Sequence, residues 1–212
     1  THSPLILQEP DYVPSMYVDN TGYDRGYQGR YDADGNFLKL ESYTQLSHYH
    51  CDMAAMLQLG RWFDYLRENG IYDNTKIILV ADHGAYLELG EEYLVEGGDE
   101  IQQYYPILMV KDFNSTGFET SEEFMTNADV PALAAEDAIE KPMNPFTGKS
   151  IDNEEKTAHD QYLIASEIAD LTKNNGTAYL PSKWYAVHDD MRNPDNWKLL
   201  SEKETVLPVT EE

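Results

Sequence analysis

The chain is poor in cysteine and has no long apolar run. Cys51 is the only cysteine among the 212 residues, which excludes an internal disulfide. Such a chain fits a reducing compartment, and it equally fits an exported bacterial protein that does not use cysteine. No apolar run approaches the roughly 20 residues that cross a bilayer as a helix, and no signal-peptide pattern is present. We therefore expect no membrane span within this chain.

Basic residues are also scarce. Lys and Arg number 15 against 39 Asp and Glu, which gives a formal net charge of −24. Nucleic-acid binding needs a basic surface to face the phosphates, so we expect no nucleic-acid partner. With 41% hydrophobic residues the chain can bury one sizeable core, and we expect one domain. The sequence opens on Thr1 rather than Met, and we expect it to be a fragment of a longer protein.

The most informative segment is a strand that ends in an Asp-His-Gly turn. Residues 76–81 are largely aliphatic and β-branched, which predicts a buried strand. Asp82 and His83 follow it, and Gly84 lets the chain turn sharply. Ligands and catalytic groups collect at strand ends in α/β sheets, and an adjacent carboxylate and imidazole offer two ligands for a divalent metal. The alternative is an Asp-His-Gly turn without chemistry.

The remaining pattern alternates helices with strands. Apolar residues at steps of three and four predict a helix over 43–68, which Asn69-Gly70 ends. A second buried strand is expected at 107–110, and further helices at 128–140 and 154–173. Large apolar residues near 184–197 are expected to pack back as a short strand and turn. This order predicts an α/β domain with a mostly parallel sheet flanked by helices.

Two other patterns resemble metal sites and are weaker. His48, His50 and Asp52 lie two residues apart on the long helix, where such positions point about 200° apart and cannot share one ion without distortion. Residues 30–40 indicate a hairpin that turns at Asp34-Gly35. Its run of Asp and Asn lacks the glutamate and the spacing of a calcium loop.

The helix and strand around the Asp-His-Gly turn carry a family resemblance. Residues 59–84 resemble the helix–strand–metal segment of the alkaline phosphatase and sulfatase superfamily, closest to its membrane-anchored lipoteichoic acid synthase and phosphoglycerol transferase relatives. The opening Thr-His-Ser-Pro resembles the Thr/Asn-His-x-Pro segment that precedes this helix there. Residues 105–110 and 124–133 are similar to the strand and helix that follow the metal site. The likeness covers most of residues 1–140.

The resemblance implies a partial alkaline-phosphatase-like sandwich, with residues 1–212 forming the C-terminal part of one catalytic domain and the N-terminal part absent. It implies that Asp82 and His83 bind a divalent metal (Mn, Zn, Mg or Ca) and that His2 contacts the phosphate or headgroup. The nucleophile and at least one acidic ligand come from N-terminal strands in such enzymes. A Thr120-Ser121 pair lies after the Asp-His pair, against the family order, and suits the start of a helix instead.

The implied function is that of a metal-dependent phosphotransferase or hydrolase acting on phospholipid, phosphate-ester or sulfate-ester substrates. Phosphoglycerol transfer to a cell-envelope glycolipid is the first expectation, on the extracytoplasmic side of a membrane-anchored bacterial parent. A sulfatase is the alternative within the superfamily. A different class is a non-catalytic extracellular interaction domain, with which the acidic surface and the tyrosine-rich segment 12–43 are compatible.

Overall fold

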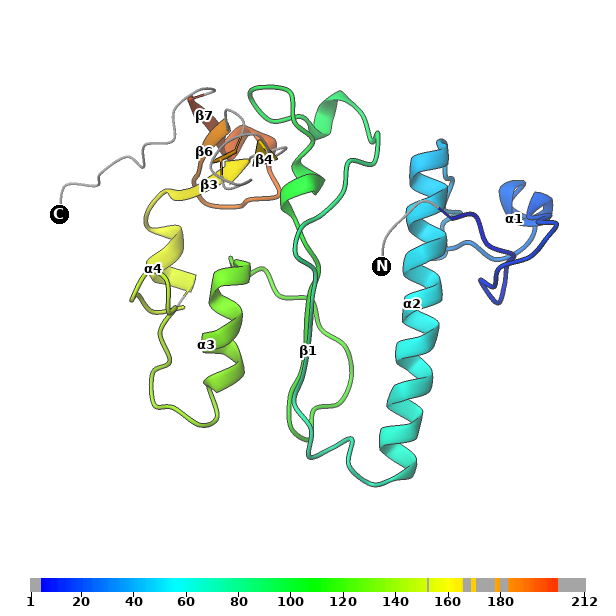
Figure 1. Cartoon of the computed structure of the whole chain (residues 1–212), viewed down its shortest axis with the longest axis horizontal. Helices are drawn as coiled ribbons and strands as arrows, with labels where there is room; N and C mark the ends of the chain where they lie inside the picture. Colours follow the sequence, from blue (N-terminus) through cyan, green and yellow to red (C-terminus); the bar gives the residue numbers. More distant parts are fainter. Residues whose placement is uncertain (1–4, 152, 166–168, 171–177, 180–182, 202–212) are drawn as a thin grey trace. The chain divides into compact units, whose positions relative to one another are not determined.

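The computed structural model describes residues 5–151, 153–165, 169–170, 178–179 and 183–201 (Figure 1). Its helices are α1 (Thr21–Asp24), α2 (Tyr43–Glu68), α3 (Val130–Ala135) and α4 (Asn153–Thr157). Its strands are β1 (Ile77–Val80), β2 (Leu108–Lys111), β3 (Gln161–Ala165), β4 (Ala169–Asp170), β5 (Ala178–Tyr179), β6 (Lys183–Val187) and β7 (Trp197–Ser201). No helix of the described part is long and apolar enough to span a membrane.

The chain divides into two compact units. The first comprises Thr1–Ile77, Tyr86–Glu88 and Val110–Thr116. The second comprises Ile78–Ala85, Leu89–Met109 and Gly117–Glu212. The long helix therefore belongs to the first unit, whereas the Asp-His-Gly turn belongs to the second.

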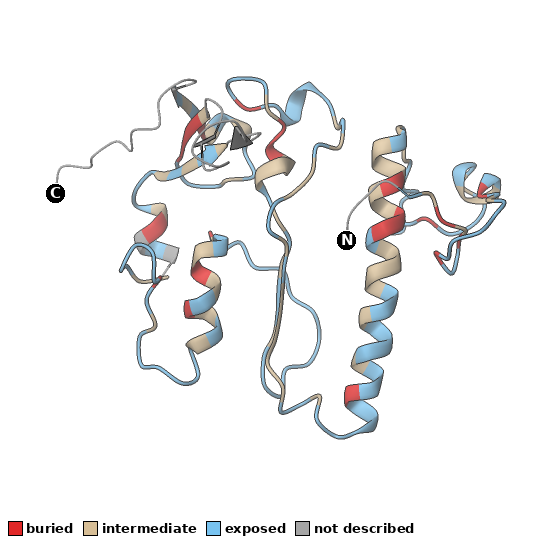
Figure 2. Cartoon of the chain, viewed as in Figure 1, coloured by how far each residue is buried: buried red, intermediate tan, exposed pale blue. Residues whose placement is uncertain are grey.

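Helix α2 has the bounds that the sequence predicts. Its N-terminus is capped by Ser42, whose Oγ accepts a hydrogen bond from the Gln45 N–H at 3.2 Å. After Glu68 the chain passes through Asn69 and then Gly70, which takes a φ of 67° and ends the helix. Figure 2 shows that few positions on α2 are fully buried, and these are Ser47, His50, Cys51 and Leu66.

A buried ion pair organises the first unit. The Arg30 guanidinium donates to both carboxylate oxygens of Glu9, at 2.9 and 2.6 Å, and both side chains are almost fully buried. His50 from α2 lies beside this pair, with its Nδ1 accepting the Leu7 N–H at 2.8 Å. Because Nδ1 accepts, the proton of the neutral ring sits on Nε2, 3.5 Å from the Glu9 carboxylate. His50 is thus part of the packing of this unit.

The hairpin predicted in the same unit is confirmed. Tyr31 and Phe37 form an antiparallel bridge. Between them, Asp32 Oδ1 accepts the Asn36 N–H at 2.8 Å and the Asp34 N–H at 3.0 Å. Gly35 takes a φ of 82°, as the turn requires. The acidic run therefore stabilises the turn, because the Asp32 carboxylate accepts hydrogen bonds from backbone N–H groups within it.

Burial of His50 makes the first unit sensitive to pH. Burial lowers the pKa of His50 below its ordinary 6.5, with Glu9 opposing and Arg30 adding to the effect. In the unfolded chain His50 therefore binds a proton more readily than in the folded unit. The contribution of His50 to the free energy of unfolding is fully present above pH 6.5 and falls as the pH drops below that value. We expect the urea midpoint of α2, followed by far-UV circular dichroism, to decrease from about pH 7.5 to about 5.5.

The matched variant is His50→Asn, since an Asn oxygen can replace Nδ1 as the acceptor for Leu7. His50→Asn should lose the part of the pH dependence of the urea midpoint that His50 causes, and it should keep helix α2. An equally steep dependence in this variant would show that other groups cause it.

The predicted mostly parallel sheet is not found in the described part of the chain. β1 and β2 pair as a two-stranded sheet. Beyond the strands, the Ala81 N–H donates to Ile107 O and the Gly84 N–H to Gln103 O, both at 3.0 Å. The partner number falls as the first segment advances, so the two segments run antiparallel. A parallel pair would need a crossover, usually a helix, whereas residues 81–107 hold short 3₁₀ turns and one isolated antiparallel bridge and no α-helix.

The two later helices were also predicted wrongly. α3 covers only 130–135 of the expected 128–140, and α4, which spans 153–157, covers only the first residues of the expected 154–173. Residues 161–165 form strand β3 instead, with alternating burial. Tyr162, Leu163 and Ile164 favour an extended backbone, and the ladder with β6 settles the choice. Residues 166–168 and 171–173 of the expected helix lie outside the described residues.

The other sheets are antiparallel as well. β6 pairs with β3 on one side and with β7 on the other, and β4 pairs with β5. The core of the second unit gathers under the three-stranded sheet, where Tyr185 is fully buried and Trp197 is 4% exposed. Asp99 accepts hydrogen bonds from the hydroxyls of Tyr104 and Tyr185, both at 2.7 Å. The predicted packing of residues 184–197 as a strand and turn is confirmed.

Candidate functional site

The Asp-His-Gly turn follows β1 and is pinned to the segment before β2. The bonds from Ala81 to Ile107 and from Gly84 to Gln103 bracket Asp82 and His83. Gly84 is required here, because a Cβ at this position would lie 1.7 Å from the carbonyl oxygen of Gln102. The glycine thus allows a close backbone approach that fixes one end of the turn.

A side chain from a distant segment fixes the other end. The Asn127 Nδ2 donates to the carbonyl oxygens of Ala81, at 3.0 Å, and Asp82, at 2.7 Å. These two carbonyls lie where the β1–β2 ladder stops. Asn127 thereby supplies donors to backbone acceptors next to both candidate ligands.

Asp82 and His83 present their side chains together and to solvent. The Asp82 Oδ2 and His83 Nε2 atoms are 3.7 Å apart, and the side chains are 89% and 75% exposed. Asp82 Oδ1 accepts the backbone N–H of His83 at 3.1 Å. His83 Nδ1 lies 2.6 Å from the carbonyl oxygen of Gly84. A protonated Nδ1 donates to that carbonyl, which leaves the Nε2 lone pair free on the side of Asp82.

This arrangement fits a divalent metal. Two ligands that each lie about 2.1 Å from one ion are at most about 4.2 Å apart, so Asp82 Oδ2 and His83 Nε2 are spaced closely enough to share it. A backbone acceptor on the second ring nitrogen is also the usual support of a metal-binding histidine. Among the described residues, no group of three or more His, Cys, Asp or Glu is placed to hold an ion. The metal role of Asp82 and His83 stays a prediction, and His2 lies outside the described residues.

The sequence reasoning missed the residues that support the turn. Asp129 is 1% exposed and accepts a hydrogen bond from Lys156 Nζ at 2.8 Å and another from Asn144 Nδ2 at 2.8 Å. It also forms a capping box with Thr126. Burial would raise the pKa of Asp129, but the hydrogen bonds from Lys156, Asn144 and Thr126 outweigh it and hold the pKa below its ordinary value. The available signal is the Asn127-Ala-Asp129 run before Pro131, which by itself is typical of a helix start.

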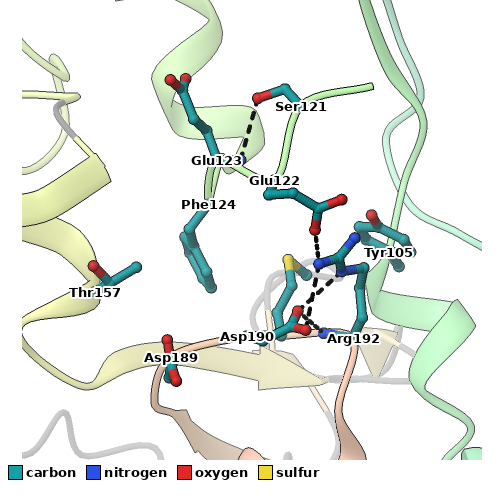
Figure 3. A pocket seen from close by; sticks show the side chains of 10 residues that line it. Tyr105, Ser121, Glu122, Glu123, Phe124, Thr157, Asp189, Asp190 and Arg192 are labelled. Atoms are coloured by element: carbon teal, nitrogen blue, oxygen red, sulfur yellow. Dashed lines mark hydrogen bonds and ion pairs between the residues drawn. The ribbon is translucent and has the colours of Figure 1, made fainter. Parts of the chain in front are cut away.

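A separate cavity of about 270 Å³ lies in the second unit (Figure 3). Arg192 pairs there with Glu122 and with Asp190, and Ser121 is among the lining residues. Ser121 Oγ accepts the Glu123 N–H at 3.2 Å, an ordinary local turn. The Thr120-Ser121 segment is therefore not the start of a helix. Among the described residues that line the cavity there is no histidine to activate a hydroxyl.

One comparison with known proteins found a distant relative. Over 139 residues, 60% of this chain, the sequence is 27% identical to the multifunctional alkaline phosphatase superfamily protein PehA of Trinickia caryophylli. The matched part is 26% of that relative's length. The similarity supports a relationship with the alkaline phosphatase superfamily and does not indicate a particular activity within that superfamily. No protein-family profile matches the chain, and no solved structure matches it.

The need for glycine at position 84 can be tested directly. We expect Gly84→Ala to displace the turn and to lower the stability of the second unit by about 1–3 kcal/mol, because the added Cβ meets backbone that cannot rotate away. The control is Gly60→Ala on α2, where the added Cβ meets nothing within 4 Å. Alanine favours the helix there by up to about 1 kcal/mol. Urea unfolding of both variants measures the change in the free energy of unfolding. A Gly84→Ala variant as stable as the unsubstituted chain would contradict the close approach of Gly84 to the Gln102 carbonyl.

Proposed function

We propose that the chain is the C-terminal part of the catalytic domain of a metal-dependent phosphotransferase or hydrolase. The observation that carries the proposal is the Asp82–His83 pair, with its two free donor atoms 3.7 Å apart at the end of β1. The similarity to an alkaline phosphatase superfamily protein supports it, because that superfamily usually works with divalent metals. The remaining ligands, the nucleophile and the N-terminal part of the domain would come from outside this chain.

The exposed surface of β1 and β2 supports an incomplete domain. Val80, Ile107 and Met109 belong to or adjoin these strands and are 39, 40 and 38% exposed. Aliphatic strand residues are normally covered on at least one face. Further parts of the same domain would bury them.

Each residue of the candidate centre has a distinct task in this mechanism. Asp82 Oδ2 and His83 Nε2 would hold the ion, while Gly84 O keeps the imidazole in the tautomer that leaves Nε2 unprotonated. When bound, a divalent metal stabilises negative charge on the nucleophile and on the phosphoryl or sulfuryl oxygens. His2 is proposed to hydrogen-bond the same oxygens or to protonate the leaving group.

Phosphoglycerol transfer to a cell-envelope glycolipid, on the extracytoplasmic side of a membrane-anchored parent, is the reaction we propose first. A sulfatase reaction is the second choice, since the same metal pair suits both esters. The nucleophile of the full-length protein separates them, because Thr favours transfer and a Cys or Ser within a sulfatase signature favours sulfate-ester hydrolysis.

A non-catalytic interaction domain is favoured by a different observation. Several tyrosines of the segment 12–43 are largely exposed, including Tyr17 (77%), Tyr27 (62%) and Tyr43 (61%). Exposed tyrosines are common in binding surfaces. Assays of the full-length protein with a phosphodiester and with a sulfate ester, each with and without Mn²⁺, decide between the classes. Metal-dependent turnover of either ester supports an enzyme. If neither ester is turned over, the proposed enzymatic function is contradicted.

A further inference from the structure

We propose that Asn127 is a positioning residue for Asp82 and His83, and that the buried Asp129–Lys156 ion pair holds Asn127 in place. The inference rests on the proposed function, because it assigns Asn127 a role in shaping a metal site. It is independent of which ester the enzyme uses.

The contacts of Asn127 carry the first step. One side-chain nitrogen bonds two successive carbonyl oxygens, those of Ala81 and Asp82, across 46 and 45 positions in the sequence. A peptide whose carbonyl is held cannot rotate freely, so the backbone on both sides of the Asp82 Cα is restrained. That restraint fixes the direction in which the Asp82 Cα–Cβ bond leaves the backbone, and it fixes the start of the His83 backbone.

The second step concerns what holds Asn127. Asn127 is the first residue of the 3₁₀ turn Asn127–Asp129, and Asp129, the last residue of this turn, is 1% exposed. The Asp129 carboxylate accepts the Thr126 N–H at 2.8 Å and the Lys156 Nζ–H at 2.8 Å. Lys156 is itself 9% exposed and also donates to Phe124 O at 3.1 Å. The residues on both sides of Asn127 are therefore anchored, and the amide projects from a rigid turn.

The exposure of Asn127 distinguishes positioning from packing. Asn127 is exposed, as are Asp82 and His83, so the bond contributes little to the core. An exposed hydrogen bond of this kind contributes little to folding stability. Loss of the side chain should therefore leave the second unit folded while freeing the turn. An aspartate at 127 would place a carboxylate oxygen against two carbonyl oxygens, which repels the turn instead of holding it.

The chain offers a matched control in Asn69. Its Nδ2 also donates to a backbone carbonyl, that of Tyr65, at 2.7 Å, and its side chain is likewise exposed. It lies at the end of α2 in the first unit. Asn69→Ala therefore removes an equivalent bond without touching the Asp-His-Gly turn.

The test is calorimetric titration of Mn²⁺ into the full-length protein carrying Asn127→Ala, Asn127→Asp, Asn69→Ala or Asp82→Ala. Supporting residues of a metal site typically contribute 10- to 100-fold in affinity, so we expect about that loss for Asn127→Ala. We expect a larger loss for Asn127→Asp and none for Asn69→Ala. Hydrogen exchange gives a second reading that needs no metal: the Gly84 amide should exchange faster in Asn127→Ala, while the unfolding midpoint followed by tryptophan fluorescence stays unchanged.

The outcomes separate the inference from the function on which it rests. Unchanged Mn²⁺ affinity in Asp82→Ala would refute the metal site itself. A loss in Asp82→Ala together with wild-type affinity in Asn127→Ala would refute positioning by Asn127 and leave the proposed function standing. A large fall in the unfolding midpoint of Asn127→Ala would show that the residue supports the fold rather than the site, which also overturns the inference.

Discussion

Replacing Asp82 or His83 with alanine is expected to lower the turnover of the full-length protein by about a thousandfold. Each replacement removes one of the two ligands that this chain supplies to the proposed ion. A bound metal contributes several kcal/mol of charge stabilisation in the transition state, and every 1.4 kcal/mol corresponds to about a factor of ten. The effect should appear mainly in kcat, because the ion acts on charge that develops during the reaction. Steady-state kinetics on the preferred ester measures it.

The matched control for this experiment is His188→Ala. His188 also lies beside a carboxylate, with Nδ1 3.1 Å from Asp160, and its side chain is 62% exposed. It lies in the same unit but outside the Asp-His-Gly turn. We expect full activity in His188→Ala. Full activity in Asp82→Ala would instead show that Asp82 has no part in the reaction and would contradict the proposed metal site.

The largest effect on stability is expected for Arg30→Ala. The variant leaves the Glu9 carboxylate buried without its cation, and breaking a buried ion pair in this way typically costs about 3–5 kcal/mol. Arg30 also pairs with Asp24 at 2.9 Å, so the loss reaches α1. The α2 signal in far-UV circular dichroism, followed through urea unfolding, reports the change because this 26-residue helix lies in the same unit.

Lys39→Ala is the control, since the Lys39–Glu41 pair has side chains that are 71% and 64% exposed. Exposed pairs contribute little, so we expect no measurable change in its urea midpoint. The double variant Glu9→Leu/Arg30→Met should recover much of the stability, because no charge is then left buried. Equal midpoints for Arg30→Ala and Lys39→Ala would show that the ion pair does not hold this unit.

Local patterns were enough to predict the elements whose signals are continuous in the sequence. Helix α2 has regularly spaced apolar residues and the Asn69-Gly70 stop, and it has the expected bounds. The aromatic pair Trp184-Tyr185 was expected in a short strand that packs back on the chain, and it lies buried in β6. In both cases the decisive interactions are close in sequence or depend on side-chain size alone.

Strand direction and the support of the turn could not be predicted in this way. Whether β1 and β2 run parallel depends on the path of residues 81–107, which form short turns without a strong local pattern. The strand character of β3 depends on β6, which lies about twenty residues later. The bond from Asn127 to Asp82 spans 45 positions, and no local rule connects the two residues. The place of Asp82 and His83 after a strand was predicted, whereas the residues that fix their geometry were not.

The central claim is that this chain supplies two ligands of a metal site that is completed elsewhere in the protein. Two protein ligands fall short of the three or four that hold a catalytic or structural ion. Titration of Mn²⁺ or Zn²⁺ into the 212-residue chain and into the full-length protein, with calorimetric detection and a parallel phosphodiesterase assay, tests the claim most directly. We predict weak binding and no turnover for the chain alone, and tight binding with turnover for the full-length protein. Tight binding by the chain alone that disappears in Asp82→Ala or His83→Ala would show a self-contained site. Equally weak binding by both proteins would point to an inactive interaction domain. Either result would contradict the claim.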